Sequence, residues 1–293
     1  MFDFDAERLR GVILEITRSN ISSEAWNWLQ EKLNLTTVSA VNTAFSIMPR
    51  KTGKEIVNIT PADEQIITEI KPGWAVKGWT TDRLCRVSFL MNLDPSDKDV
   101  YYKTIENLFL AAEMTELVAL YSSLPVLSYP EIWKMRCAEG IRSNIGTVLE
   151  AIMYGNPYPA DYLDEKAWNQ LVMKAFFTEK KVMRIYGFDE RANPDLAIIL
   201  SDYAHERWAA GRSVNPLLWR AMAKFIDTRL KKDLEKVLKE GDLNEKQAAA
   251  LTICHSNSTE AKDLLHNHSE LVSAIENKKL TWEQVELEQI IHH

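Results

Sequence analysis

Hydrophobic residues recur at intervals of three and four along most of the chain, the spacing of amphipathic α-helices. The pattern predicts helices at about 5–17, 22–34, 36–47, 62–70, 81–92, 98–111, 114–124 and 130–153. In the second half it predicts helices at about 162–178, 194–210, 216–239, 244–254, 259–275 and 281–290. Only residues 55–60 resemble a strand, and one strand forms no sheet. The sequence therefore predicts an all-α fold.

No Gly/Ser-rich linker divides the chain, so we expect one helical domain over residues 1–293. Many helices joined by short turns favour antiparallel pairs stacked in an irregular HEAT-like, α-solenoid-like array. Because no repeating consensus is visible, a compact multi-helix domain is the alternative. The mixed Lys/Glu pattern from about residue 230 to 293 indicates solvated helical faces.

Composition narrows the class of protein. The chain has 35 Lys and Arg against 42 Asp and Glu, a net charge of −7, whereas a general nucleic-acid binder carries a basic excess. The three cysteines, Cys85, Cys137 and Cys254, form no CxxC pair, which favours reduced thiols. The N-terminus lacks a signal-peptide pattern, and no apolar run approaches the roughly 20 residues of a membrane span. We expect a cytoplasmic globular protein.

The densest polar cluster lies around residues 202–208. At about 100° per residue, Asp202, His205 and Glu206 share one sector of a helix. An Asp three residues before a His can orient the imidazole for general acid/base catalysis, so all three are candidate catalytic residues. A solvent-exposed polar face is the alternative interpretation. Arg207 falls in the apolar sector, where we expect burial and an ion pair with a neighbouring carboxylate.

Other polar segments are candidates for ligand binding. Residues 136–142 predict a helix with Arg136 and Glu139 on the face opposite Cys137, which an ordinary amphipathic helix also explains. Residues 49–54 form a basic turn that can meet an anion, although it is not a P-loop. Asp82 and Arg86 are spaced to form an ion pair, worth a few tenths of a kcal/mol if exposed.

No pattern predicts a metal or cofactor. A di-iron site in a helical bundle needs two Glu-x-x-His pairs, and the chain has a single Asp202-x-x-His205. His255, His266 and His268 lack carboxylates at a clear spacing, and His292-His293 is either a native or an added pair. There is no nucleotide fingerprint and no Gly-x-Ser-x-Gly. We therefore expect neither metal nor cofactor.

A series of ordered motifs over roughly residues 45–225 resembles the EboA family, named for a small bacterial and algal-plastid gene cluster. The motifs are Pro49-Arg50…Gly53-Lys54, Trp79-Thr80-x-Asp82-x-x-x-Arg86, Leu124-Pro125…Tyr129-Pro130-Glu131, Arg136-x-x-Glu139-Gly140-Ile141-Arg142-Ser143-Asn144, Asn156-Pro157-Tyr158-Pro159, Ala167-Trp168-Asn169-Gln170-x-Val172-x-Lys174-Ala175, Asp189-x-Arg191-Ala192-Asn193 and Asp202-Tyr203-Ala204-His205-Glu206-Arg207-Trp208-Ala209-Ala210-Gly211-Arg212. The N-terminal helices and the last 60 or so residues match poorly.

The resemblance implies a pathway. The family's cluster neighbours resemble a UbiA-type prenyltransferase, a TatD-like hydrolase, a sugar-phosphate-isomerase-like protein, a dehydroquinate-synthase-like cyclase and a phosphatase. Together they imply assembly of a prenylated, cyclitol-like secondary metabolite, with proteins of the same cluster and an anionic or prenylated small molecule as expected partners. Candidate substrate-binding residues are Arg50, Lys54, Arg136, Glu139, Arg142, Asn169 and Arg207.

Two hypotheses follow. The first is a non-catalytic accessory protein that binds a pathway intermediate or a partner enzyme. The second is an enzyme with His205 as acid/base in a helical cavity, which requires Glu139, Arg142, Asp202, His205 and Glu206 to converge. The absence of a known catalytic constellation favours the first.

Overall fold

The protein is described by a computed structural model that covers residues 3–291. Its elements are helical, and the only strand-like pairings in this range are isolated bridges between Ile56 and Thr80 and between Tyr154 and Ile185. The predicted all-α fold is therefore confirmed. The chain divides into two compact units: unit 1 comprises residues 1–164 and 184–186, and unit 2 comprises residues 165–183 and 187–293. The HEAT-like stacking and the single domain stay predictions.

Unit 1 contains ten α-helices and two short 3-10 helices within the described residues. These are α1 (Ala6–Asn20), α2 (Ser23–Lys32), α3 (Val38–Thr52), α4 (Pro61–Ile70), α5 (Thr81–Met91), α6 (Lys98–Ala111), α7 (Met114–Ser123), η1 (Leu124–Val126), η2 (Pro130–Trp133), α8 (Lys134–Arg142), α9 (Gly146–Met153) and α10 (Tyr158–Tyr162).

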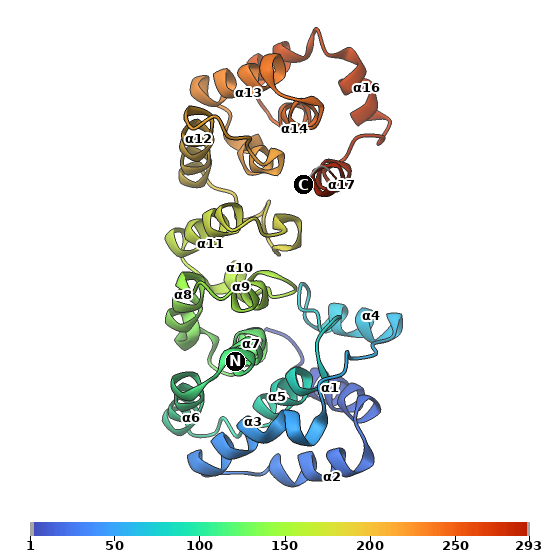
Figure 1. Cartoon of the computed structure of the whole chain (residues 1–293), viewed down its shortest axis with the longest axis vertical. Coiled ribbons are helices and arrows are strands. Elements are labelled where there is room, and N and C mark those ends of the chain that lie inside the picture. The colour runs from blue at the N-terminus through green and yellow to red at the C-terminus, as the bar shows by residue number, and fades with distance from the viewer. Residues whose placement is uncertain (1–2, 292–293) are drawn as a thin grey trace. The chain divides into compact units, whose positions relative to one another are not determined.

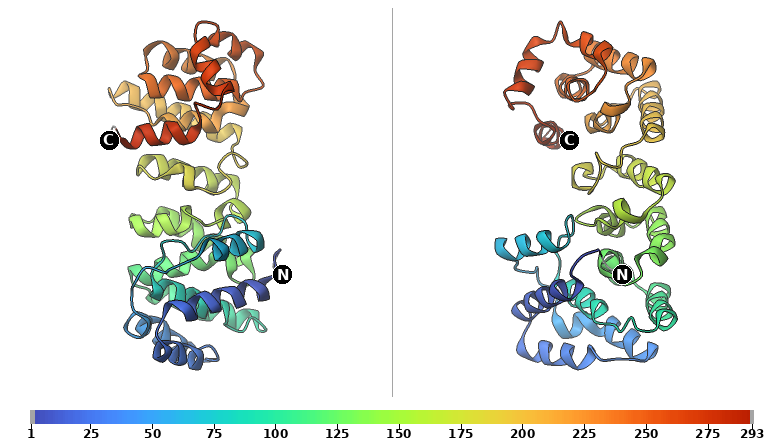
Figure 2. Two further views of the ribbon diagram at one scale, coloured as in Figure 1. Left: turned by 90° about the vertical axis from the view of Figure 1, so that its right-hand side faces the viewer. Right: turned by 180° about the vertical axis from the view of Figure 1, so that it is seen from behind.

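Helix α5 forms the centre of unit 1. It packs against α1, α3 and α7, and α7 in turn packs against α9, as the ribbons in Figures 1 and 2 show. Of the 11 residues of α5, all are buried except Arg83. A helix that is buried on every side must satisfy its polar side chains inside the protein. Arg83 is the one position where this helix opens toward a surface.

Unit 2 is built from α11 (Glu165–Phe177), η3 (Val182–Arg184), α12 (Pro194–Ala209), η4 (Pro216–Phe225), α13 (Thr228–Glu240), α14 (Leu243–Cys254), α15 (Thr259–Lys262), η5 (Asp263–Leu265), α16 (Ser269–Glu276) and α17 (Trp282–Ile291), with Arg184 itself belonging to unit 1. Helix α14 is central, and η4, α13, α16 and α17 pack around it (Figures 1 and 2). Its buried residues include Ala248, Ala249 and Ala250, whose small side chains allow close approach.

Three predicted helices are interrupted. The segment 259–275 divides into α15, η5 and α16, and the segments 130–153 and 216–239 are also broken. The segment 130–153 ends its first α-helix at Arg142, and the backbone N–H of Ile145 then donates to the Ser143 hydroxyl. The segment 216–239 is a 3-10 helix up to Phe225, and α13 starts afresh with Asp227 as its N-cap. Both breaks are stabilised by a polar side chain that accepts from the backbone two or three residues later. Among the described residues, no helix is long and apolar enough to cross a membrane.

Candidate functional site

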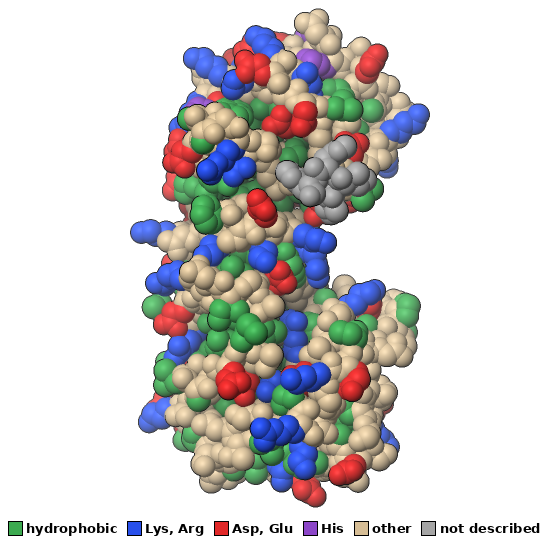
Figure 3. Space-filling model, in the orientation of Figure 1, with side chains coloured by type: hydrophobic (Ala, Val, Ile, Leu, Met, Phe, Trp, Pro, Cys, Tyr) green, Lys and Arg blue, Asp and Glu red, His purple; other side chains and the backbone are tan. Residues whose placement is uncertain are grey.

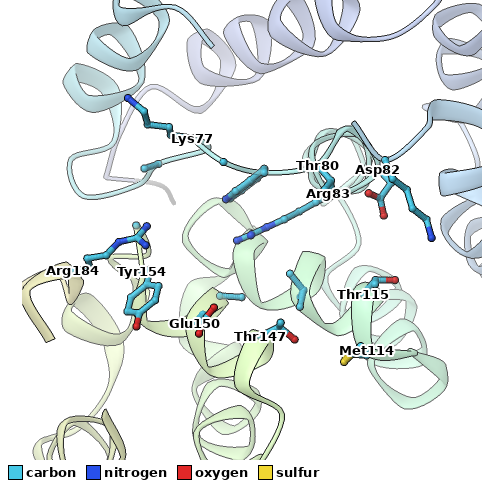
Figure 4. A pocket seen from close by; sticks show the side chains of 17 residues that line it. Lys77, Thr80, Asp82, Arg83, Met114, Thr115, Thr147, Glu150, Tyr154 and Arg184 are labelled. Atoms are coloured by element: carbon cyan, nitrogen blue, oxygen red, sulfur yellow. The ribbon is translucent and has the colours of Figure 1, made fainter. Parts of the chain in front are cut away.

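Unit 1 contains a cavity of about 620 Å³ beside α5. Its lining comes from the residues just after α3, the loop 75–80, and helices α5, α7 and α9, together with Arg184 (Figure 4). The apolar part of the lining is Ala75, Trp79, Met114, Val118, Ala151 and the ring of Tyr154. The polar part includes Lys54, Lys77, Thr80, Asp82, Arg83, Thr115, Thr147, Glu150 and Arg184.

The loop before α5 is fixed by local bonds. The Val57 N–H donates to the Trp79 carbonyl at 2.8 Å, and the Thr81 N–H donates to the Glu55 carbonyl at 2.8 Å. Trp79 packs edge-on against Trp74, whose indole N–H donates to the Ser122 carbonyl at 3.1 Å. These contacts hold the Trp79 ring at the wall of the cavity.

Arg83 projects from α5 into the cavity (Figure 4). Its guanidinium lies over the Trp79 ring, 4.2 Å from the ring centroid, and its Nε donates to the Ser122 hydroxyl at 2.9 Å. Ser122 in turn donates to the Val118 carbonyl, which orients the hydroxyl toward Arg83. Among the described residues, Arg83 forms no ion pair. Burial lowers the pKa of Arg83 to about 9, although Asp82 opposes the shift.

Arg86, three residues later on α5, differs from Arg83 because carboxylates lie beside its guanidinium. Its side chain is fully buried, and it bonds to Asp82 at 2.7 Å and lies 3.6 Å from Glu116. Its Nε also donates to the Phe45 carbonyl at 3.0 Å. Burial lowers the pKa of Arg86, while the two carboxylates raise it. The predicted Asp82–Arg86 pair is therefore present but buried, and it neutralises the Asp82 carboxylate at the cavity wall.

The remaining charged groups make the cavity basic despite the net negative charge of the chain. Arg184 lies over the Tyr154 ring, 4.4 Å from its centroid, and Lys54 also lines the cavity. Lys77 forms an ion pair with Glu64 at 2.9 Å, and Figure 4 shows it pointing away from the centre. In Figure 3 some of the Lys and Arg side chains of unit 1 lie between the α4 side and the α7–α9 side, with Asp or Glu side chains beside them.

The predicted catalytic cluster lies on α12 in unit 2, where His205 and Asp202 are already paired. His205 Nε2 lies 2.6 Å from the buried Asp233 carboxylate, which also accepts from the Ser201 hydroxyl at 2.7 Å. The imidazole stacks on Trp208, 5.4 Å between ring centroids. Asp202 pairs with Arg229 at the surface.

One face of α12 is buried, and the helix packs against α11 and η4. Leu196, Ala197, Leu200, Ser201 and Ala204 are buried, whereas Ile199 is 38% exposed.

The predicted burial of Arg207 is wrong. The side chain is partly exposed and its Nε donates to the Ser213 carbonyl at 2.8 Å. It lines a second cavity of about 840 Å³ in unit 2, with Tyr203, Asn244 and Glu286 among the other lining residues. Glu206 is exposed, and neither Asp202, His205 nor Glu206 lines this cavity or the one in unit 1.

Among the described residues there is no group of three or more His, Cys, Asp or Glu that could hold a metal ion. The cysteines are free, as the sequence predicted, and Cys85 and Cys137 are buried. Burial raises the pKa of Cys85 to about 12, so this thiol stays protonated. His292 and His293 lie outside the described residues.

With this geometry established, comparison with known proteins identifies the family. The sequence model of the family described as "Metabolite traffic protein EboA" matches residues 10–223. The chain belongs to the EboA family. The match begins at residue 10, whereas the motifs indicated a start near residue 45. Helices α1 and α2 therefore lie almost wholly within the family region. No curated protein and no solved structure matched the chain.

The candidate residues of the family motifs lie at several places. Lys54 lines the unit 1 cavity, whereas Arg50 is exposed on the last turn of α3. Arg136 pairs with Glu106 of α6 and with Glu139 at 2.8 Å. Arg142 is exposed and its Nε donates to the Ala138 carbonyl at 3.2 Å.

Asn169 of unit 2 is buried and exchanges amide hydrogen bonds with Asn193, the N-cap of α12. Its amide groups therefore tie α11 to the start of α12. This arrangement accounts for the residue without any ligand.

Sequence reasoning missed Arg83 and Arg184, the two arginines of the unit 1 cavity. Arg83 lies between Asp82 and Arg86 on α5, and their i,i+4 spacing predicted a pair that left Arg83 unremarked. Arg184 lies about 30 residues from Tyr154, and the bridge that joins their segments has no signal in the sequence. The cavity nevertheless brings together Lys54, Trp79, Thr80 and Asp82 from two of the motifs that carry the family resemblance.

Proposed function

We propose that this EboA-family protein is a non-catalytic accessory protein that binds an anionic pathway metabolite in the unit 1 cavity. The observation that carries the proposal is Arg83, a partly buried cation at the cavity that pairs with no carboxylate of the described residues. The name of the family, metabolite traffic protein, agrees with a role in holding a metabolite rather than converting it.

The surroundings of Arg83 favour an anion as its missing partner. A desolvated guanidinium costs free energy unless it is paired, and the lowered pKa of Arg83 reflects that cost. Stacking on Trp79 and the bond from Nε to Ser122 hold the guanidinium plane in one orientation. Its remaining N–H groups form a fork that suits a phosphate or a carboxylate.

The apolar lining favours a ligand that also has a hydrophobic part. Trp79, Met114, Val118 and Ala151 provide contact area beside the charged groups. A pocket of this size with an apolar wall and a few convergent polar groups is typical of small-molecule sites. We therefore propose an anionic metabolite with an apolar tail, such as a prenylated intermediate of the pathway, which proteins of the same cluster would supply or receive.

The enzyme hypothesis has less support. It requires Glu139, Arg142, Asp202, His205 and Glu206 to converge on one cavity, but none of them lines the cavity that holds Arg83. His205 is paired with Asp233, and Asp202 is paired with Arg229. Within the unit 1 cavity, Asp82 is committed to Arg86. These pairings support binding without acid/base chemistry.

The test is isothermal titration calorimetry of the full chain with geranyl diphosphate, inorganic diphosphate and geraniol. We expect geranyl diphosphate to bind most tightly, because it alone presents both an anion and an apolar tail. Arg83→Met keeps an apolar stem over Trp79 and removes the charge, and we expect it to weaken geranyl diphosphate binding by about tenfold to a hundredfold, the range for a charged hydrogen bond.

The matched control is Arg142→Met, an exposed arginine of unit 1 outside the cavity, which should bind like the wild type. Circular dichroism establishes that both variants are folded. The proposal fails if the wild type binds none of the three probes, or if Arg83→Met and Arg142→Met bind geranyl diphosphate equally well.

A further inference from the structure

We infer that Arg184 is a second anion-binding residue of the unit 1 cavity, so that the ligand carries two linked anionic groups, as a diphosphate ester does. This inference rests on the proposed function and specifies the class of ligand. It concerns a side chain that the family motifs and the sequence patterns did not mark.

Arg184 is held in place by its own segment. Ile185 forms a β-bridge with Tyr154, and the guanidinium of Arg184 lies over the Tyr154 ring. Tyr186 packs on Gly73, where an added Cβ would come within 2.3 Å of the Tyr186 ring. Residues 184–186 therefore form an anchored stretch at the cavity, although the residues on either side belong to unit 2.

The two arginines face one another. Figure 4 shows Arg83 and Arg184 reaching into the cavity from opposite sides, with their guanidinium ends directed toward the space between them. Each guanidinium lies against an aromatic ring, Trp79 for Arg83 and Tyr154 for Arg184, at 4.2 and 4.4 Å from the ring centroids. An arginine stacked on a ring keeps its N–H fork available in the plane, which suits bidentate binding of a phosphate.

No acidic side chain of the cavity neutralises this pair. Asp82 is bonded to Arg86, and Glu150 takes part in another interaction. Neither Arg83 nor Arg184 forms an ion pair with any residue that the structure describes. Two unpaired cations that converge on one space repel each other, and a ligand with two negative groups removes that repulsion. A ligand with a single anionic group would satisfy one arginine and leave the other.

The experiment compares geranyl monophosphate with geranyl diphosphate by calorimetry of the full chain. We expect the wild type to bind the diphosphate at least tenfold more tightly than the monophosphate. Arg184→Met should reduce diphosphate binding to about the level of the monophosphate and change monophosphate binding less than twofold. Arg83→Met should weaken both, and Arg142→Met should weaken neither.

A second variant tests the position of Arg184 while keeping its charge. Gly73→Ala places a methyl group within 2.3 Å of the Tyr186 ring, so the ring or the Gly73 backbone, whose φ of 80° disfavours a side chain, must shift. We expect it to lose the preference for the diphosphate as Arg184→Met does.

Equal binding of both probes by the wild type, or an Arg184→Met variant that keeps its preference for the diphosphate, would overturn the inference and leave the Arg83 site standing. Absence of binding by the wild type to either probe would overturn the proposed function as well.

Discussion

The polar clusters of the two units differ in whether their charges are satisfied. On α12 and α13 of unit 2, His205 meets Asp233 and Asp202 meets Arg229. In the unit 1 cavity, Arg83 contacts a hydroxyl and an aromatic ring and forms no ion pair with the part of the chain that the structure describes. The presence of a charge that is paired within the protein is accounted for by the stability of the fold. The presence of an unpaired charge in a cavity is not, and it points to a ligand. The cluster with the richer set of catalytic residue types is therefore the weaker candidate for a site.

The same contrast is present within α5. Arg86 and Arg83 are three residues apart, and burial lowers the pKa of both. Arg86 is compensated by Asp82, Glu116 and the Phe45 carbonyl, and it connects α5 with α3 and α7. Arg83 instead contacts the Ser122 hydroxyl and the Trp79 ring. One arginine therefore holds the fold, and the other is left for a ligand.

The largest expected effect tests this division directly. Arg86→Met leaves Asp82 and Glu116 buried without their cation, and we expect it to cost about 3–5 kcal/mol of unfolding free energy, as breaking a buried ion pair does. Arg83→Met removes an unpaired desolvated cation, and we expect a loss below about 1 kcal/mol or a gain. Urea denaturation of both variants beside the wild type measures the difference.

Arg136→Met, which removes a partly exposed pair with Glu106, serves as the control and should fall between the two. If Arg83→Met destabilises unit 1 as much as Arg86→Met does, the distinction between a structural and a binding arginine on α5 is wrong.

A smaller effect is expected from pH. Because burial lowers the pKa of Arg83 to about 9 instead of 12.5, the residue is protonated at neutral pH and loses its charge as the pH rises through about 9. The phosphate groups of geranyl diphosphate are already ionised in this range. The affinity should therefore fall about tenfold between about pH 8 and about pH 10, which is the ratio of protonated fractions for such a pKa.

Arg83→Met supplies the reference for this titration, since it retains every other titrating group of the cavity. Its residual affinity should change far less over the same interval. A wild-type affinity that is constant from about pH 8 to about pH 10 would show that the charge of Arg83 does not contribute to binding.

The sequence predicted the local structure of this protein better than its contacts. Helical periodicity located most helices, but it continued through the breaks after Arg142 and before Thr228, because the apolar spacing persists across them. The Asp82–Arg86 pair followed from its spacing. The burial of this pair could not be predicted from the spacing, because it depends on α3 and α7, which pack against α5.

The candidate site was harder to predict for a related reason. His205 and Asp202 attracted attention because they are polar neighbours in the sequence, yet their partners Asp233 and Arg229 lie on the next helix. Arg83 was not predicted as a site residue, because no local sequence pattern reveals that an arginine lacks a carboxylate partner. Whether a charge is paired is decided by residues far along the chain, and only the structure brings them together.

The smallest expected effect concerns His205. Its side chain is 45% exposed, and replacement by glutamine keeps a polar group near Asp233, which retains its bond from Ser201. We expect His205→Gln to cost about 1 kcal/mol or less of unfolding free energy, the net value of one hydrogen bond, and to leave geranyl diphosphate binding unchanged. Urea denaturation and calorimetry measure both quantities on one preparation. A loss of ligand binding with the fold intact would instead place His205 in a functional site, and would reverse the contrast between the paired cluster of unit 2 and the unpaired arginine of unit 1.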